Sequence, residues 1–166
     1  MEFRKLTKDE IDVRVGGVYE TGITLLLYKN ARVDMDILDE TVGMFNWQKS
    51  YQLIDGQLFC TLEIWDKEKE QWIKKQDVGV ESKSEAEKGR ASDAQKRAAV
   101  AAGIGRALYT APFIWIDHDK VKFNKDGKVK DRFKVRYIDY KDKAINCLVI
   151  ENGRGELVFS YGTPQK

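Results

Sequence analysis

The sequence is poor in cysteine, histidine and proline. It contains two cysteines, one histidine and two prolines in 166 residues. Cys60 and Cys147 are far apart and lie in strand-like segments, which indicates neither a disulfide framework nor a zinc site, so we expect a reducing, cytoplasmic setting. No apolar run approaches the roughly 20 residues of a membrane-spanning helix. The first twelve residues also lack the apolar stretch of a signal peptide, so we expect no membrane partner.

Motifs for nucleotide chemistry and covalent catalysis are also missing. There is no G-x-x-x-x-G-K-[ST] phosphate loop, and the Gly103-Ile104-Gly105 segment lies in a helical pattern without a strand directly before it. Asp117-His118-Asp119 is the one segment that offers a metal ligand or an acid–base pair. A lone histidine among loop acids is more often a solvated turn residue. From the sequence we therefore expect a protein that is not an enzyme, without catalytic residues, cofactor or metal site.

The composition is that of a globular chain without a strong charge of either sign. Hydrophobic residues make up 42% and charged residues 34%, and the formal net charge is +2. A chain of this length can bury a sizeable core. A net charge of +2 is too small for a strongly basic nucleic-acid binder. Any DNA site must therefore come from local clustering of cations or from repetition of the subunit in an assembly.

The segment Glu81–Trp115 organises the predicted fold. It starts with charged residues and continues into an alanine-rich run, 98–111, in which Arg106 is the single charged residue. Alanine is the strongest helix former, and Pro112 disfavours helix for the residue before it. We therefore predict one long helix from residue 84 or 85 to residue 111 at the latest. On this helix Arg106 lies opposite the apolar stripe that contains Ile104. Its side chain either extends to solvent, pairs within the protein or binds an anion. Helix geometry slightly favours extension to solvent.

The remaining chain alternates between strand-like and helical patterns. Residues 12–15 and 21–29 are predicted strands, and residues 31–41 a helix with Asn30 as N-cap. Three strands follow, over 47–54, 57–65 and 72–80, and Asp55-Gly56 is a hairpin signal between the first two. Leu62 is expected to face the long helix. Further strands are predicted over 121–123, 133–140, 144–150 and 157–161.

These elements predict an α+β fold. Its core, residues 1–116, contains a helix, a three-stranded antiparallel β-meander and the long helix. Residues 117–166 form a β-rich C-terminal extension, which either belongs to the same domain or is a small subdomain. Basic residues stand beside aromatic residues around the two helices and the meander. Phosphates bind cations and unpaired bases stack on aromatic rings, so a few converging members of this set would form a single-stranded nucleic-acid site.

Several segments resemble the annealing domain of the Rad-fifty-two group of recombination mediators. Tyr28–Val33 (YKNARV), followed by a predicted helix and by Gly43–Trp47 (GMFNW), is similar to the opening of that domain. Asp77–Val80 (DVGV), followed by residues 88–108, is similar to its D-V-G strand and long helix. Gly103–Tyr109 (GIGRALY) is similar to the phage branch of the family. The resemblance covers about residues 23–116.

The resemblance implies a β-β-β-α annealing-protein fold and ATP-independent annealing of single strands in phage homologous recombination and DNA repair. Such proteins form rings or helical filaments. The implied partners are single-stranded DNA, further copies of the chain, a single-strand-binding protein and an exonuclease, in a bacterial host cytoplasm if a phage encodes the chain. Family arginines fall on Arg32 and Arg106, whereas Gly105 and Tyr109 replace a lysine and an arginine of eukaryotic members. The predicted DNA-binding residues are Arg32, Lys49, Lys88, Lys96, Arg97, Arg106 and Tyr109.

Three alternative functions fit parts of the pattern. A double-stranded-RNA-binding module also has the order helix, three strands, helix, and its last helix starts with a basic cluster followed by alanines, as in Lys96–Ala99. Such a module is shorter, and the β-rich tail and the late Arg106 argue against it. The second alternative is a nuclease that uses Asp117-His118-Asp119. The third is a structural oligomer without a ligand.

Overall fold

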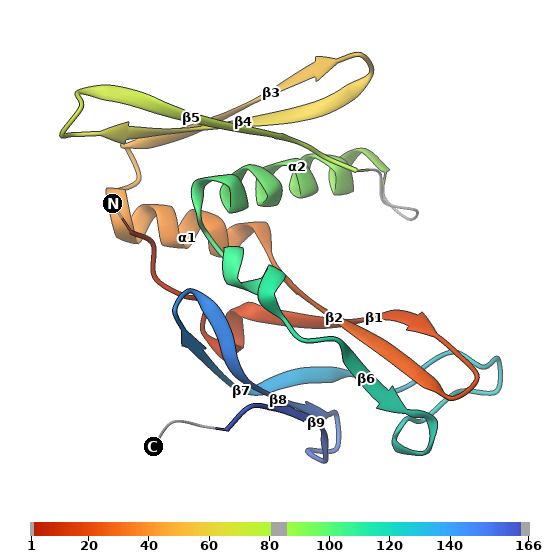
Figure 1. Ribbon diagram of the computed structural model, residues 1–166. Coiled ribbons are helices and arrows are strands. Elements are labelled where there is room, and N and C mark those ends of the chain that lie inside the picture. Colours follow the sequence, from red (N-terminus) through yellow and green to blue (C-terminus); the bar gives the residue numbers. More distant parts are fainter. Residues whose placement is uncertain (1, 81–85, 164–166) are drawn as a thin grey trace. The chain divides into compact units, whose positions relative to one another are not determined.

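The chain divides into two compact units in the computed structural model, which describes residues 2–80 and 86–163, with the backbone alone for 86–88. Unit 1 consists of Met1–Lys5 and Asn30–Arg106, and unit 2 consists of Leu6–Lys29 and Ala107–Lys166. Each unit has its own sheet, with three strands in unit 1 and six in unit 2 (Figure 1). Unit 2 is therefore assembled from both ends of the chain.

Unit 1 has the predicted order of a helix, a three-stranded meander and a second helix. Its elements are α1 (Ala31–Val42), β3 (Trp47–Ile54), β4 (Gln57–Asp66), β5 (Gln71–Val78) and α2 (Ala86–Ala102). Asn30 is the predicted N-cap of α1, because its Oδ1 accepts from the backbone N–H of Arg32 at 3.0 Å. The hairpin turn at Asp55-Gly56 has the expected positive φ at both residues, 49° and 74°. The α+β class and this element order are confirmed.

Helix α2 lies along one face of the meander (Figure 1). The side chains that face the meander are small. On β4, Cys60, Leu62 and Ile64 are at most 6% exposed. On α2, the buried small residues are Ala94, Ala98 and Ala99, each at most 1% exposed. Gly79, directly after β5, permits the close approach, because a Cβ there would lie 3.0 Å from the Cβ of Ala94. The predicted orientation of Leu62 toward the long helix is confirmed.

The long helix ends at Ala102, and the prediction that Arg106 lies within it is wrong. The backbone N–H of Gly103 donates to the carbonyl of Val100, and that of Ile104 donates to the carbonyl of Ala99, both at 2.9 Å. These two bonds form a Schellman motif, which favours glycine because its φ is positive, here 113°. The apolar residues that continue the alanine-rich pattern form a separate 3₁₀ helix, η2 (Arg106–Thr110).

Unit 2 is a six-stranded antiparallel sheet that curls into a nearly closed, barrel-like form. Its strands are β1 (Ile11–Val18), β2 (Gly22–Lys29), β6 (Ile114–Asp117), β7 (Phe133–Lys141), β8 (Ala144–Asn152) and β9 (Leu157–Tyr161). They follow the order β6-β2-β1-β7-β8-β9, and the edge strands β6 and β9 contact each other. The predicted β-rich tail thus shares one sheet with two strands from the N-terminal part of the chain.

The connection between β6 and β7 differs from the sequence prediction. The predicted strand over 121–123 is wrong, because this segment follows the short 3₁₀ helix η3 (His118–Lys120) and contributes one isolated bridge, between Phe123 and Val129. The strand β6 is an element that the sequence pattern does not predict separately. Asn124 Oδ1 accepts from the backbone N–H groups of Asp126 and Lys128, at 3.1 and 2.8 Å, and so closes the turn at the tip. Side-chain hydrogen bonding of this kind favours a turn over a continuous strand.

Candidate nucleic-acid interface

A buried glutamine joins β3, α1 and α2 within unit 1. Lys49 Nζ donates to Oε1 of Gln95 at 2.6 Å, and Nε2 of Gln95 donates to the carbonyl of Ala31 at 2.9 Å. The hydroxyl of Tyr51 lies 3.5 Å from the same Oε1. Gln95 is 6% exposed, whereas Lys49 is exposed and Tyr51 is 41% exposed. A buried amide therefore binds the ammonium group of an exposed lysine beside an accessible aromatic ring.

Arg32 lies at the start of α1, next to the carbonyl that Gln95 binds. Its side chain is exposed. Lys49 Nζ is also 3.8 Å from Sδ of Met35, so the ammonium group lies close to the first turns of α1. The acidic residue of the first turn, Asp34, is 0% exposed. We call Arg32, Lys49, Tyr51 and Gln95 the Lys49 cluster, which combines exposed cations with the positive end of a helix dipole.

Burial keeps Tyr51 of the cluster and the neighbouring Cys60 uncharged. Burial raises the pKa of the Tyr51 phenol above its ordinary value, and burial likewise raises the pKa of the Cys60 thiol that faces it. Both groups stay neutral at neutral pH. Tyr51 therefore offers a neutral ring and a hydroxyl, while Lys49 and Arg32 supply the positive charge.

Arg97 has a different neighbour from the Lys49 cluster. Its Nε is 3.2 Å from Oδ1 of Asp77, an ion pair between α2 and β5. The strands β3 and β5 are the two opposite edges of the meander. Arg97 therefore pairs with one edge strand, whereas Lys49 belongs to the other. Lys96 is half-buried on α2. The side chain of Lys88, another predicted DNA-binding residue, lies outside the described residues.

The Arg106 guanidinium caps the end of α2. Its Nε donates to the carbonyl of Val100 at 3.1 Å, and its Nη2 donates to the carbonyl of Ala101 at 2.8 Å. The last carbonyls of a helix have no partners within it and carry a partial negative charge, which a cation offsets. Arg106 is exposed apart from these bonds. Tyr109 belongs to unit 2 and is 72% exposed.

The residue that sequence reasoning missed is Gln95. It lies next to alanines in the sequence, and helical periodicity groups it with Lys88, Ala99 and Arg106. The sequence signal for it is a polar residue placed among alanines, of which Ala94 and Ala98 are buried in the structure. A polar group buried at such a position needs hydrogen-bond partners, which here are Lys49 and a backbone carbonyl.

The segment Asp117-His118-Asp119 has other contacts. The His118 ring stacks on Phe123 with centroids 4.4 Å apart and planes 15° apart, and Asp117 is 3.6 Å from Nζ of Lys120. Among the residues that the structure describes, no group of three or more His, Cys, Asp and Glu side chains is arranged to hold a metal ion.

Comparison with models of known families, with curated proteins and with solved structures finds no match for this chain. Over the described ranges 2–80 and 86–163, the helices are too short or too polar to cross a membrane. The function therefore has to be inferred from the Lys49 cluster and from the motifs of the sequence.

Proposed function

We propose that this protein binds single-stranded DNA and anneals complementary strands without ATP, in homologous recombination and DNA repair, as a phage-type relative of the Rad-fifty-two group. The Lys49 cluster is the observation that carries the proposal. The ammonium group of the exposed residue Lys49 is held by a buried amide, beside the Tyr51 ring and the N-terminal turn of α1 that carries Arg32. Phosphates bind cations and helix N-termini, and unpaired bases stack on aromatic rings.

Annealing needs a surface that neutralises phosphates and leaves base edges free to pair. In this proposal Lys49 and Arg32 bind phosphate oxygens, and Tyr51 supports a base or sugar. Such a reaction needs no nucleophile, nucleotide cofactor or metal ion. Arg97 and Arg106 contribute less in this proposal, because their guanidinium groups bind an acid and helix-end carbonyls within the protein.

One Lys49 cluster offers too few cations for tight binding, so the proposal includes self-association. Copies of the chain in a ring or filament repeat the cluster along one strand, and their phosphate contacts add up. A single-strand-binding protein and an exonuclease are the further partners that the resemblance implies. Light scattering should give a mass well above that of a dimer, and a monomeric mass with and without DNA would reject the assembly.

The test of the function is an annealing assay with two complementary oligonucleotides and no nucleotide added. We expect the protein to accelerate duplex formation over the spontaneous rate, and a gel shift to show tighter binding of single-stranded DNA than of duplex RNA. A preference for duplex RNA without annealing would instead support the double-stranded-RNA-binding alternative. Strand cleavage in the presence of a divalent metal would support the nuclease alternative.

A further inference from the structure

Unit 2 carries an exposed group of aromatic rings on the outer side of its sheet. The ring centroids of Tyr19 and Trp115 are 5.6 Å apart, and those of Phe113 and Trp115 are 6.3 Å apart with planes inclined by 18°. Tyr19 is 55% exposed and Phe113 is 75% exposed. The neighbouring residues of β6, Ile114 and Ile116, are buried on the inner side. We call Tyr19, Phe113 and Trp115 the aromatic platform.

Glycine backbone lies directly beneath two of these rings. A Cβ on Gly22 would lie 2.6 Å from Cζ2 of Trp115, and a Cβ on Gly17 would lie 2.9 Å from the ring of Tyr19. At these distances, any residue larger than glycine would require the ring or the backbone to move. The rings of Tyr19 and Trp115 therefore lie against glycine backbone. Trp115 is half-buried, and Tyr19 and Phe113 are exposed. A supported, exposed apolar surface is typical of a binding site.

A lysine-rich hairpin, residues 121–132, follows the platform in the chain, and the segment just before it is bonded to the turn that carries Tyr19. The backbone N–H of His118, just before the hairpin, donates to the carbonyl of Thr21 at 3.0 Å, in the turn that carries Tyr19. Asp117, an acid beside the platform, accepts from Nε1 of Trp115 at 3.1 Å and pairs with Lys120. The exposed lysines of the hairpin are Lys122, Lys125, Lys128 and Lys130.

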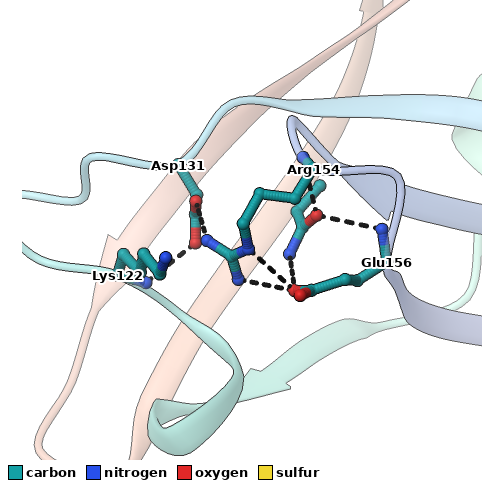
Figure 2. A network of polar contacts seen from close by, with 5 residues as sticks. Lys122, Asp131, Arg154 and Glu156 are labelled. Atoms are coloured by element: carbon teal, nitrogen blue, oxygen red, sulfur yellow. Dashed lines mark hydrogen bonds and ion pairs between the residues drawn. The ribbon is translucent and has the colours of Figure 1, made fainter.

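The lysine-rich hairpin is held in place by a network of polar contacts (Figure 2). Asp131 Oδ2 accepts from the backbone N–H of Lys122 at 2.8 Å, and its Oδ1 accepts from Nη1 of Arg154, also at 2.8 Å. Arg154 donates further to Oε2 of Glu156 at 2.6 Å. The carboxylate of Asp131 is 8% exposed and is compensated by Arg154. The hairpin also exposes Asp126 and Arg132, so with its four exposed lysines it presents a net positive charge to solvent.

We propose that the aromatic platform stacks unpaired bases of single-stranded DNA while the lysine-rich hairpin binds the adjoining phosphates. This second DNA site rests on the proposed function, because its ligand is of the same kind, single-stranded DNA. Aromatic faces next to lysines match the two chemical parts of a single strand, bases and phosphates. An apolar protein partner or a second copy of the chain would match the rings and leave the lysines without a role.

The test compares three ring variants with a matched control. Tyr19→Ala, Phe113→Ala and Phe113→Leu each remove one ring, and the leucine keeps apolar bulk at position 113. Tyr161→Ala, in β9, removes an exposed tyrosine outside the platform. Fluorescence anisotropy with a labelled single-stranded oligonucleotide, repeated over a range of salt, gives the affinity and its salt slope. Each ring variant should bind about 5- to 100-fold more weakly, with an unchanged salt slope because stacking releases no counterions.

The double variant Lys125→Gln/Lys128→Gln tests the hairpin separately, and it should lower the salt slope by about 0.7 for each phosphate that is no longer neutralised. Wild-type affinity in the ring variants, with the wild-type protein binding normally, would overturn the platform and leave the proposed function standing. Failure of the wild-type protein to bind single-stranded DNA would overturn both. A lower mass in light scattering for Phe113→Ala, at unchanged affinity, would make the platform an interface between copies and would also overturn the proposal.

Discussion

Lys49 Nζ donates to Oε1 of Gln95 at 2.6 Å, although the two residues are 46 positions apart in the sequence. The bond joins an exposed cation on β3 to a buried amide on α2, and the same amide binds the start of α1 at Ala31. A long side chain on a surface normally samples many rotamers, and ordering it on DNA binding costs entropy. Gln95 reduces that cost, because it fixes the ammonium group in the free protein.

Gln95→Leu should therefore weaken two properties together. It removes the hydrogen bond from Gln95 to the carbonyl of Ala31, which we expect to lower the free energy of unfolding by about 0.5–1.5 kcal/mol. It also releases Lys49, so affinity for single-stranded DNA should fall in the folded protein. Gln76→Leu is the matched control, because Gln76 is exposed and donates to the hydroxyl of Thr61 at 2.8 Å on the surface of the meander. Urea unfolding and DNA titration of both variants give the comparison, and equal behaviour of the two would refute a special role for Gln95.

Arg106→Ala distinguishes a structural from a DNA-binding arginine. Removal of the two bonds to the carbonyls of Val100 and Ala101 should lower the free energy of unfolding by about 1 kcal/mol. Arg106→Lys keeps the charge at the helix end and should recover part of that stability. The checks are thermal unfolding and DNA affinity on the same samples. An unchanged melting temperature together with weaker DNA binding would assign Arg106 to the phosphates, as the family resemblance implies.

Leu62→Asp should unfold unit 1. The side chain is 2% exposed between β4 and α2, and an unpaired charge there costs more than about 3 kcal/mol. Both α-helices belong to unit 1, so the helical signal in circular dichroism should fall. Ser50→Asp, an exposed position on the neighbouring strand β3, is the control and should keep the signal. A helical Leu62→Asp protein would contradict the packing of the meander on α2.

Acid should destabilise unit 2 through Glu156. Hydrogen bonds from Arg154 and Asn152 lower the pKa of this carboxyl from 4.5 to about 2. A pKa that is lower in the folded state contributes stability above about pH 4.5, and this contribution is lost as the pH falls toward 2. Glu156→Gln should flatten the pH dependence of the unfolding midpoint in that window. An identical pH profile in wild type and variant would show that the network in Figure 2 does not persist in solution.

Local sequence signals are sufficient to predict most of unit 1. The Asp55-Gly56 turn, the Asn30 cap and the alternation of β4 are each encoded by neighbouring residues. Local patterns also predict most strands of unit 2, but they do not predict how the strands pair, because β1 pairs with β7 through residues as distant as Asp12 and Lys134. Pairing at that separation depends on the packing of the whole chain and leaves no pattern in either strand alone.

The sequence predicts members of the candidate site rather than its geometry. Charge and resemblance indicate Lys49 and Arg32, but the link between Lys49 and the start of α1 depends on Gln95, whose role appears only when β3 and α2 pack together. The prediction places Arg106 on a helix because alanines continue on both sides of Gly103. The positive φ of that glycine ends the helix, and a glycine within an alanine-rich run does not by itself reveal it.

The central claim is that the Lys49 cluster binds the phosphates of single-stranded DNA. Its most direct test is the salt dependence of oligonucleotide binding by the wild-type protein, Lys49→Met and Lys67→Met. Lys67 is an exposed lysine of the β4–β5 turn, so the two variants have the same net charge. We predict weaker binding and a salt slope lower by about 0.7 per bound subunit for Lys49→Met, with Lys67→Met close to wild type. Equal affinities and slopes for the two variants would contradict the claim.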